Sequence, residues 1–164
     1  MSEIILILHN IRSAHNVGSL FRTAEGFGVN KIIVSGYTPY PTFNGDSRLP
    51  HVRDKIVKQI HKTALGAESM VPFEYTDSLD LNSLRNKGYL IVGLEQNRKS
   101  IDIRSWKYTS KIALLVGEEV DGIDLQHLEL CDIIIEIPMK GKKESFNVSV
   151  AGGIALYEIS RHTQ

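Results

Sequence analysis

Residues 112–123 read IALLVGEEVDGI, an aliphatic run that passes directly into a glycine and an acidic turn. A continuous apolar run of this length is typical of a strand covered on both faces, as in a parallel sheet. In α/β folds, ligands bind beyond the carboxyl ends of such strands. Gly117, which ends the run, would let a ligand approach the backbone closely. An ordinary strand-to-helix turn with acidic residues would explain the same stretch.

Similar runs recur along the chain, and helical patterns lie between them. The other predicted strands cover 4–8, 31–35, 89–94 and 132–137. An apolar stripe at helical spacing follows the first strand, and Asn16 is its expected N-cap. Further helices are expected over 77–87, 124–130 and 147–161, and the turn-rich stretch 36–50 is expected to be a loop. This alternation predicts an α/β fold with a mostly parallel sheet flanked by helices.

The composition excludes several classes of protein. The chain has 164 residues, 19 basic and 19 acidic side chains, and one cysteine, Cys131. A disulfide framework is thereby excluded, and no His or Cys spacing predicts a metal site. The first apolar run is too short for a signal peptide or a membrane span, which favours a cytoplasmic protein. The glycine-rich dinucleotide and phosphate loops and the hydrolase elbow are absent from the sequence.

Three segments at predicted strand ends carry candidate chemistry, and 112–123 is one of them. Residues 10–29, NIRSAHNVGSLFRTAEGFGV, open a helix on which Arg22 lies opposite the apolar stripe. Arg22 is either a solvated surface residue or a guanidinium aimed at a phosphate or ribose. Residues 135–156, IEIPMKGKKESFNVSVAGGIAL, end a strand and introduce the last helix, which Ser145 or Asn147 would cap.

Together and in this order, the three segments resemble the signature motifs of the SpoU, or TrmH-like, branch of the SPOUT RNA methyltransferases. KTALGAES, residues 62–69, resembles a linking segment of that family, and the resemblance covers essentially the whole chain. It implies a C-terminal trefoil knot, S-adenosylmethionine as cofactor, and methyl transfer to a ribose 2′-hydroxyl of RNA. It also implies a homodimer whose active sites draw on both subunits. The last helix is the expected interface, although burial within one subunit would explain its apolar character equally well.

The resemblance assigns roles by position. The implied catalytic set is Asn16, Arg22, Glu119, Ser145 and Asn147. The implied cofactor pocket is lined by Leu94, Gly117, Ile137, Met139 and Phe146, where the family often has Leu at the last position. Because a guanidinium is effectively always protonated, we expect Arg22 to bind phosphate and position the hydroxyl. Glu119 would fix either Arg22 or a loop of the partner subunit.

Local charge marks the expected RNA contact. Residues 48–62 hold five basic side chains against one acidic, and the 140–144 loop adds three lysines against one glutamate. Phosphate contacts are expected from Arg48, Arg53, Lys55, Lys58, Lys142 and Lys143. Loop aromatics at Tyr37, Tyr40 and Phe43 could stack on a base. The alternative is a solvated helix face with aromatics packed on the core.

The first motif begins near residue 10, so we expect one catalytic domain over 1–164 and no separate N-terminal RNA-binding domain. A catalytic domain that binds RNA without a separate RNA-binding domain favours a compact element, such as a tRNA loop, over rRNA as substrate. Two alternatives stay open, namely an inactive RNA-binding protein on the same fold and a base-modifying SPOUT enzyme. The complete catalytic set argues against the first, and the pairing of Asn16 with Arg22 favours ribose over base.

Overall fold

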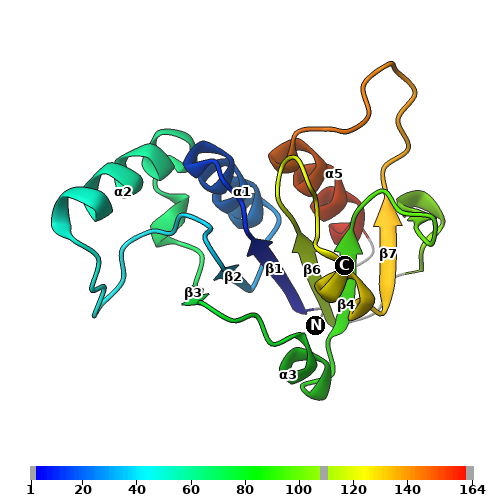
Figure 1. Ribbon diagram of the computed structural model, residues 1–164, viewed down its shortest axis with the longest axis horizontal. Helices are drawn as coiled ribbons and strands as arrows, with labels where there is room; N and C mark the ends of the chain where they lie inside the picture. The colour runs from blue at the N-terminus through cyan, green and yellow to red at the C-terminus, as the bar shows by residue number, and fades with distance from the viewer. Residues whose placement is uncertain (1–2, 108–110, 162–164) are drawn as a thin grey trace.

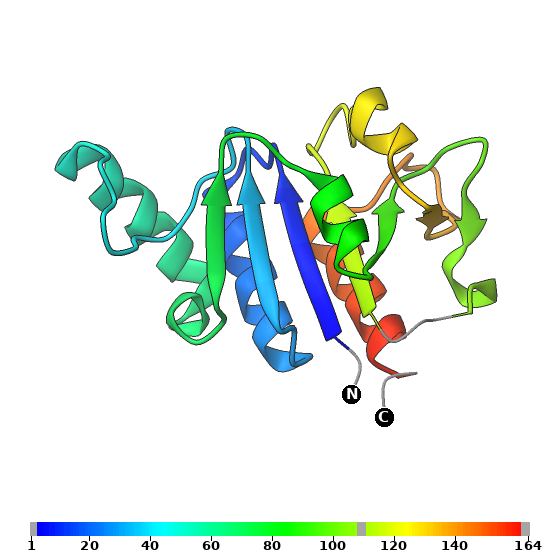
Figure 2. The same ribbon diagram turned by 90° about the horizontal axis from the view of Figure 1, so that it is seen from below.

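The chain forms one all-parallel sheet with helices on both faces (Figures 1 and 2). The computed structural model describes residues 3–107 and 111–161. Within them, seven strands lie in the order β3-β2-β1-β6-β4-β7-β5. Their bounds are β1 (Glu3–His9), β2 (Lys31–Ser35), β3 (Phe73–Thr76), β4 (Leu90–Leu94), β5 (Ile101–Asp102), β6 (Lys111–Val116) and β7 (Ile133–Glu136). The predicted α/β fold is therefore confirmed.

The order of the strands in the sheet differs from their order in the chain: β6 lies between β1 and β4, and β7 lies between β4 and β5. Strand β6 pairs with β1 on one side and β4 on the other, and β7 pairs with β4 and β5. The loops that follow β4, β6 and β7 consequently meet at one edge of the sheet, because parallel strands end on the same side. The trefoil knot that the family implies stays a prediction.

The helices divide between the two faces of the sheet. They are α1 (Ala14–Gly26), α2 (Pro50–Ala64), α3 (Leu81–Asn86), α4 (Leu125–Glu129) and α5 (Val148–Ser160), with 3₁₀ turns η1 (Ala67–Ser69) and η2 (Ile103–Ser105). Helices α1 and α5 pack with Leu6 and Leu8 of β1 on one face, and α3 and α4 pack with Ile5 and Ile7 on the other. Figure 2 shows this division, with α2 lying outside α1. Alternate residues of β1 thus serve two separate cores.

Helix α1 begins earlier than the sequence indicates. Its N-cap is Ser13, whose hydroxyl accepts a hydrogen bond from the backbone N of Asn16, so the expectation that Asn16 is the N-cap is wrong. Asn16 lies in the first turn instead, where its side chain is free to act elsewhere. At α5 the cap is Asn147, whose side chain accepts from Ser149 N, and of the two residues proposed there Ser145 is not the cap.

Candidate active site

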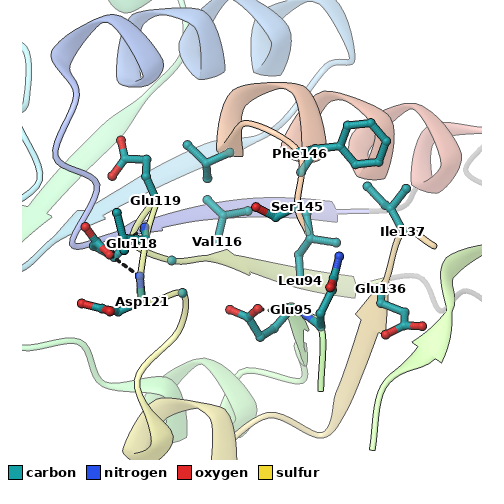
Figure 3. A pocket seen from close by; sticks show the side chains of 16 residues that line it. Leu94, Glu95, Val116, Glu118, Glu119, Asp121, Glu136, Ile137, Ser145 and Phe146 are labelled. Atoms are coloured by element: carbon teal, nitrogen blue, oxygen red, sulfur yellow. Dashed lines mark hydrogen bonds between the residues drawn. The ribbon is translucent and has the colours of Figure 1, made fainter. Parts of the chain in front are cut away.

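A pocket opens beyond the carboxyl ends of β4, β6 and β7 (Figure 3). Its apolar lining comes from Leu94, Val116, Ile137, Phe146, Val148 and Ala151. Its lining also includes five carboxylates and no lysine or arginine: Glu95, Glu118, Glu119, Asp121 and Glu136. The pocket therefore combines apolar surface with negative charge, which suits a ligand that carries both an apolar body and a positive charge.

The turn after β6 is held in shape by two glycines. Glu118 and Gly122 exchange backbone hydrogen bonds of 3.1 and 3.0 Å, and Gly122 has a φ of +72°. A Cβ at Gly117 would lie 2.6 Å from the backbone of Gly122. The expectation that Gly117 clears space for a ligand is therefore incomplete, because a side chain there would first collide with the turn itself.

The Glu118 side chain stabilises the same turn through hydrogen bonds to its backbone. Its side chain is buried, and its carboxylate accepts hydrogen bonds from the backbone N of Val120 at 2.8 Å and of Asp121. It also forms an ion pair with the Arg12 guanidinium, which comes from the loop after β1. This pair was not predicted, since nothing in the sequence near Arg12 or Glu118 indicates that they meet.

A chain of hydrogen bonds joins the three sequence motifs. Asn16 Nδ2 donates to Glu119 Oε1 at 2.9 Å, and Asn147 Nδ2 donates to Asn16 Oδ1 at 3.2 Å. Glu119 also accepts from the backbone N of Arg12 and Ser13. Each amide uses its NH₂ group as donor and its oxygen as acceptor, so the chain is consistent from end to end. Three segments distant in sequence thus meet at one side of the pocket.

Glu119 binds the loop of its own subunit, and not Arg22. Burial acts to raise the pKa of Glu119, but the hydrogen bonds from Arg12, Asn16 and Ser13 outweigh it and leave that pKa below its usual value. The carboxylate is accordingly ionised at neutral pH and serves as an anchor for the N-terminus of α1.

Four of the five predicted cofactor residues line the pocket, and these are Leu94, Gly117, Ile137 and Phe146. Met139 is not among the lining residues and lies in the loop beyond them. Figure 3 shows Phe146 beside Ile137, with Ser145 between the α5 side of the pocket and Leu94. The Phe146 side chain is 40% exposed, so the pocket presents an aromatic surface to solvent.

Arg22 does not reach the pocket of its own chain. It is exposed on α1, six residues after Asn16, which places it about 9 Å further along the helix axis and on another side of the helix. The described residues include no ion-pair partner for Arg22. Of the five predicted catalytic residues, the structure therefore brings together Asn16, Glu119, Ser145 and Asn147 and leaves Arg22 outside.

The predicted RNA-binding residues fall into two groups. Arg48 is engaged within its own loop, because it pairs with Asp46, donates to the carbonyls of Tyr40 and Pro41, and lies 3.7 Å from the Tyr40 ring centroid. The others lie on exposed or partly exposed surface, in α2 for Arg53, Lys55 and Lys58 and in the loop before α5 for Lys142 and Lys143.

The loop aromatics also differ in their surroundings. Tyr40 stacks on Tyr75 with centroids 4.0 Å apart, and Phe43 meets Phe73 edge to face at 6.4 Å. Tyr40 therefore packs on the core, which was the alternative given for these aromatics, whereas Phe43 stays 42% exposed. Tyr37 is exposed and remains available for stacking.

Within the described part of the chain, no helix is long and apolar enough to cross a membrane.

The fold and this site define an α/β protein with a ligand pocket among the loops that follow β4, β6 and β7. A comparison with protein-family models identifies the family to which this protein belongs. The model described as the SpoU rRNA Methylase family matches residues 3–157. The chain belongs to this family. The resemblance based on the three motifs is thereby confirmed.

Two curated relatives represent the substrates named within the family. The chain is 34% identical to the 23S rRNA (guanosine-2′-O-)-methyltransferase RlmB of Coxiella burnetii, over 98% of this chain and 59% of that protein. It is 29% identical to the tRNA (guanosine(18)-2′-O)-methyltransferase of Aquifex aeolicus, over 99% of this chain and 71% of that protein. The chain thus spans about three fifths of the length of the RlmB relative.

Solved structures share the fold over nearly the whole chain. The TrmH/SpoU tRNA modifying enzyme of A. aeolicus superposes with a TM-score of 0.79 at 27% identity, covering 99% of this chain and 76% of that one. An AdoMet-bound rRNA methyltransferase from Sinorhizobium meliloti gives a TM-score of 0.80 at 23% identity, covering 99% and 57%. At 23% identity, the comparison with the S. meliloti structure shows a shared fold.

Proposed function

We propose that this protein transfers a methyl group from S-adenosylmethionine to the ribose 2′-hydroxyl of a guanosine in structured RNA. The observation that carries the proposal is the hydrogen-bond chain from Glu119 through Asn16 to Asn147, which joins all three motifs beside the pocket. The relatives support both the reaction and the base, because the rRNA and the tRNA enzymes are both named as guanosine 2′-O-methyltransferases.

The pocket residues fit the cofactor. S-adenosylmethionine supplies an electrophilic methyl group on a positively charged sulfonium. The apolar side chains of Leu94, Ile137 and Phe146 suit its adenosine. Glu118 is paired with Arg12, and the other four carboxylates of the lining, which form no ion pair among the described residues, favour its positive charge. The same charge disfavours an anionic ligand such as a nucleotide phosphate at this position. Met139 stays a prediction as a further contact.

The chain's own residues act by positioning. Glu119 and Asn16 fix the start of α1 against the turn after β6, and Asn147 fixes the start of α5 against both. Ser145 lines the pocket beside this chain and offers a hydroxyl to the incoming ribose. Holding the 2′-hydroxyl close to the methyl group and in line with it can supply much of the reduction in barrier.

Arg22 acts, in this proposal, in the pocket of a partner subunit. It is exposed and lies outside its own pocket, and α5 carries an exposed apolar stripe of Val150, Ile154 and Tyr157 at helical spacing. Packing two copies through α5 would cover this stripe and bring each Arg22 toward the other subunit. The guanidinium would then hold an RNA phosphate next to the reacting ribose.

The basic face of α2 is the proposed RNA contact. Lys55 and Lys58 are exposed, and Lys62 continues the same face at helical spacing. Phosphate contacts from such a face contribute affinity that depends on salt and little on sequence. Lys142 and Lys143 border the pocket loop and would hold RNA near the reacting ribose.

The test is a nucleoside digest. The purified protein is incubated with labelled S-adenosylmethionine and, in separate arms, with unmodified total tRNA and unmodified rRNA. We expect 2′-O-methylguanosine in one arm, and that arm identifies the RNA class. Arg22→Ala should abolish the product and leave donor binding, measured by calorimetry, unchanged within about threefold.

Two results would contradict the proposal. A methylated base in the digest would establish a base-modifying enzyme. Donor binding without any product in either arm would favour the alternative of an RNA-binding protein on the same fold.

A further inference from the structure

Three side chains capable of ligating a metal meet at the carboxyl end of β1. His9 ends β1, Asp124 is the N-cap of α4, and His127 lies in the first turn of α4. One ligand atom from each lies within 4.8 Å of the other two. His9 Nε2 is 3.3 Å from Asp124 Oδ2, and His127 Nδ1 is 2.7 Å from the same oxygen. The proposed function uses none of these residues.

Hydrogen bonds determine which face His9 presents to the cluster. Asn10 Oδ1 accepts from the backbone N of Tyr37, which leaves the Asn10 NH₂ group directed at His9 Nε2, 3.1 Å away. An amide NH₂ can only donate, so Nε2 carries a lone pair and Nδ1 carries the proton toward Ser35 Oγ at 2.8 Å. The Nε2 lone pair accepts this hydrogen bond from Asn10 and lies 3.3 Å from Asp124 Oδ2, so a metal ion bound at Nε2 would replace the Asn10 donor.

The surroundings favour the forms of these groups that bind metals. His9 is 7% exposed, and burial, with the nearby His127 ring, lowers its pKa and keeps it neutral. Burial acts to raise the pKa of Asp124, but hydrogen bonds from His127 outweigh it and the carboxylate stays ionised. Metal ligation requires a neutral imidazole and an ionised carboxylate.

We propose that His9, Asp124 and His127 form a zinc-binding site with three protein ligands. Zinc bonds of about 2.0–2.1 Å at tetrahedral angles place neighbouring ligand atoms about 3.3 Å apart, which is the spacing of His9 Nε2 and Asp124 Oδ2. His127 would move back by about 0.6 Å and carry its proton on Nε2, so that Nδ1 becomes a ligand. Water would complete the four ligands.

Two further features favour zinc. Two imidazoles with one carboxylate select zinc over magnesium or calcium, which prefer oxygen ligands. Ser35 holds the other nitrogen of His9, as outer hydrogen-bond partners of metal-bound histidines commonly do. Because His9 precedes the loop that Glu119 anchors and Asp124 follows the turn of Gly117 and Gly122, a bound ion would brace both pocket loops.

The test uses the full chain without an affinity tag, first dialysed against EDTA. Zinc chloride is titrated against a chromophoric chelator, and cobalt(II) replaces zinc in a parallel absorption experiment. We expect one equivalent of zinc per chain, a visible cobalt spectrum of a four-coordinate site, and no competition from magnesium in large excess. Asp124→Asn, which keeps the N-cap oxygen, and His127→Gln should each weaken zinc binding by about tenfold or more.

Two variants make the test specific. Ser35→Ala removes only the outer partner of His9 and should weaken zinc binding by about tenfold. His61→Gln is the matched control, because His61 also pairs with one carboxylate, that of Glu68, but on the exposed surface of α2 and without a second histidine. It should bind zinc as the unaltered chain does. Circular dichroism verifies that each variant is folded.

The proposal is overturned if the unaltered chain binds no zinc in competition with the chelator. It is also overturned if Asp124→Asn and His127→Gln bind zinc as tightly as His61→Gln, since the ion would then lie elsewhere.

Discussion

At the scale of single residues, Gly117 shows how tightly the pocket is constrained. A Cβ there would lie 2.6 Å from the carbonyl carbon and oxygen of Gly122, and backbone atoms cannot move aside as a flexible side chain can. We expect Gly117→Ala to displace the turn, to lower the free energy of unfolding by about 1–3 kcal/mol and to weaken donor binding. Urea denaturation and calorimetry measure the two effects.

Gly26 is the matched control for this prediction. It lies at the end of α1, and a Cβ there would meet nothing within 4 Å. Gly26→Ala should leave donor binding unchanged and alter stability by less than about 1 kcal/mol, in the stabilising direction. Equal losses of donor binding in both variants would refute the explanation from the turn.

Arg48 leads to a prediction about pH. Its hydrogen bonds hold the pKa of Asp46 at about 2, below the ordinary 3.8. The lowered pKa stabilises the fold fully above pH 4, and this contribution disappears as the pH falls from about 4 toward 2, because the unfolded chain takes up the proton first. Arg48→Gln should therefore lower stability at pH 7 by about 2 kcal/mol, and by less at pH 3.

Urea denaturation at both pH values tests this difference. Arg53→Gln is the comparison, since Arg53 pairs with Asp54 on the exposed surface of α2. Its effect should stay below about 1 kcal/mol at either pH. An effect of Arg48→Gln that is as large at pH 3 as at pH 7 would show that the Asp46 pair is not its cause.

At the scale of secondary-structure elements, α2 carries a prediction about RNA. Lys55 and Lys58 face solvent on one side of the helix. Replacing both with Ala should weaken binding of the RNA identified by the digest, with a salt dependence reduced by about two units of slope. Fluorescence anisotropy at several KCl concentrations measures this.

Lys87→Ala is the control for the α2 variant. Lys87 follows α3, which covers the opposite face of the sheet from α1, and it is exposed. An equal loss of affinity from Lys87→Ala would indicate a nonspecific charge effect, and a double variant with unchanged salt dependence would remove α2 from the RNA surface.

The strands that were predicted from the sequence are those with a continuous aliphatic run. Strands β1, β2, β4, β6 and β7 contain aliphatic runs that are visible without context. Strand β5 has two residues, and β3 alternates partly exposed positions, so neither produces a continuous apolar run. The N-cap of α1 was predicted at Asn16 because Asn16 directly precedes the apolar stripe that begins at Val17. The helix begins at Ala14, and its N-cap is Ser13.

At the scale of the whole molecule, the structure brings together motif residues that local spacing does not connect. The motif residues Asn16, Glu119 and Asn147 meet because their strands end at one edge of the sheet. Local pattern could not indicate that Arg12 meets Glu118 or that His9 meets Asp124, because more than a hundred residues separate the two members of each pair. Only the register of β1 beside β6 brings them together.

The proposed composite site predicts complementation between two inactive variants. Arg22→Ala removes the group that would serve the partner's pocket, and Asn16→Ala breaks the hydrogen-bond chain in a subunit's own pocket. Co-expressed with different tags and purified as a mixed dimer, the two chains should form one intact site and one doubly impaired site. We expect each variant alone to be inactive and the mixed dimer to show about half of the unaltered activity.

The matched pair is Asn16→Ala with Glu119→Gln, because both residues belong to the same pocket of one chain. Their mixed dimer has one defect in each site and should stay inactive, although light scattering should show the same dimeric mass. Recovery in this second dimer would mean that complementation repairs folding and not chemistry. If instead the dimer of Arg22→Ala with Asn16→Ala forms and stays inactive, Arg22 serves its own subunit, and α1 must then move toward its own pocket when RNA binds.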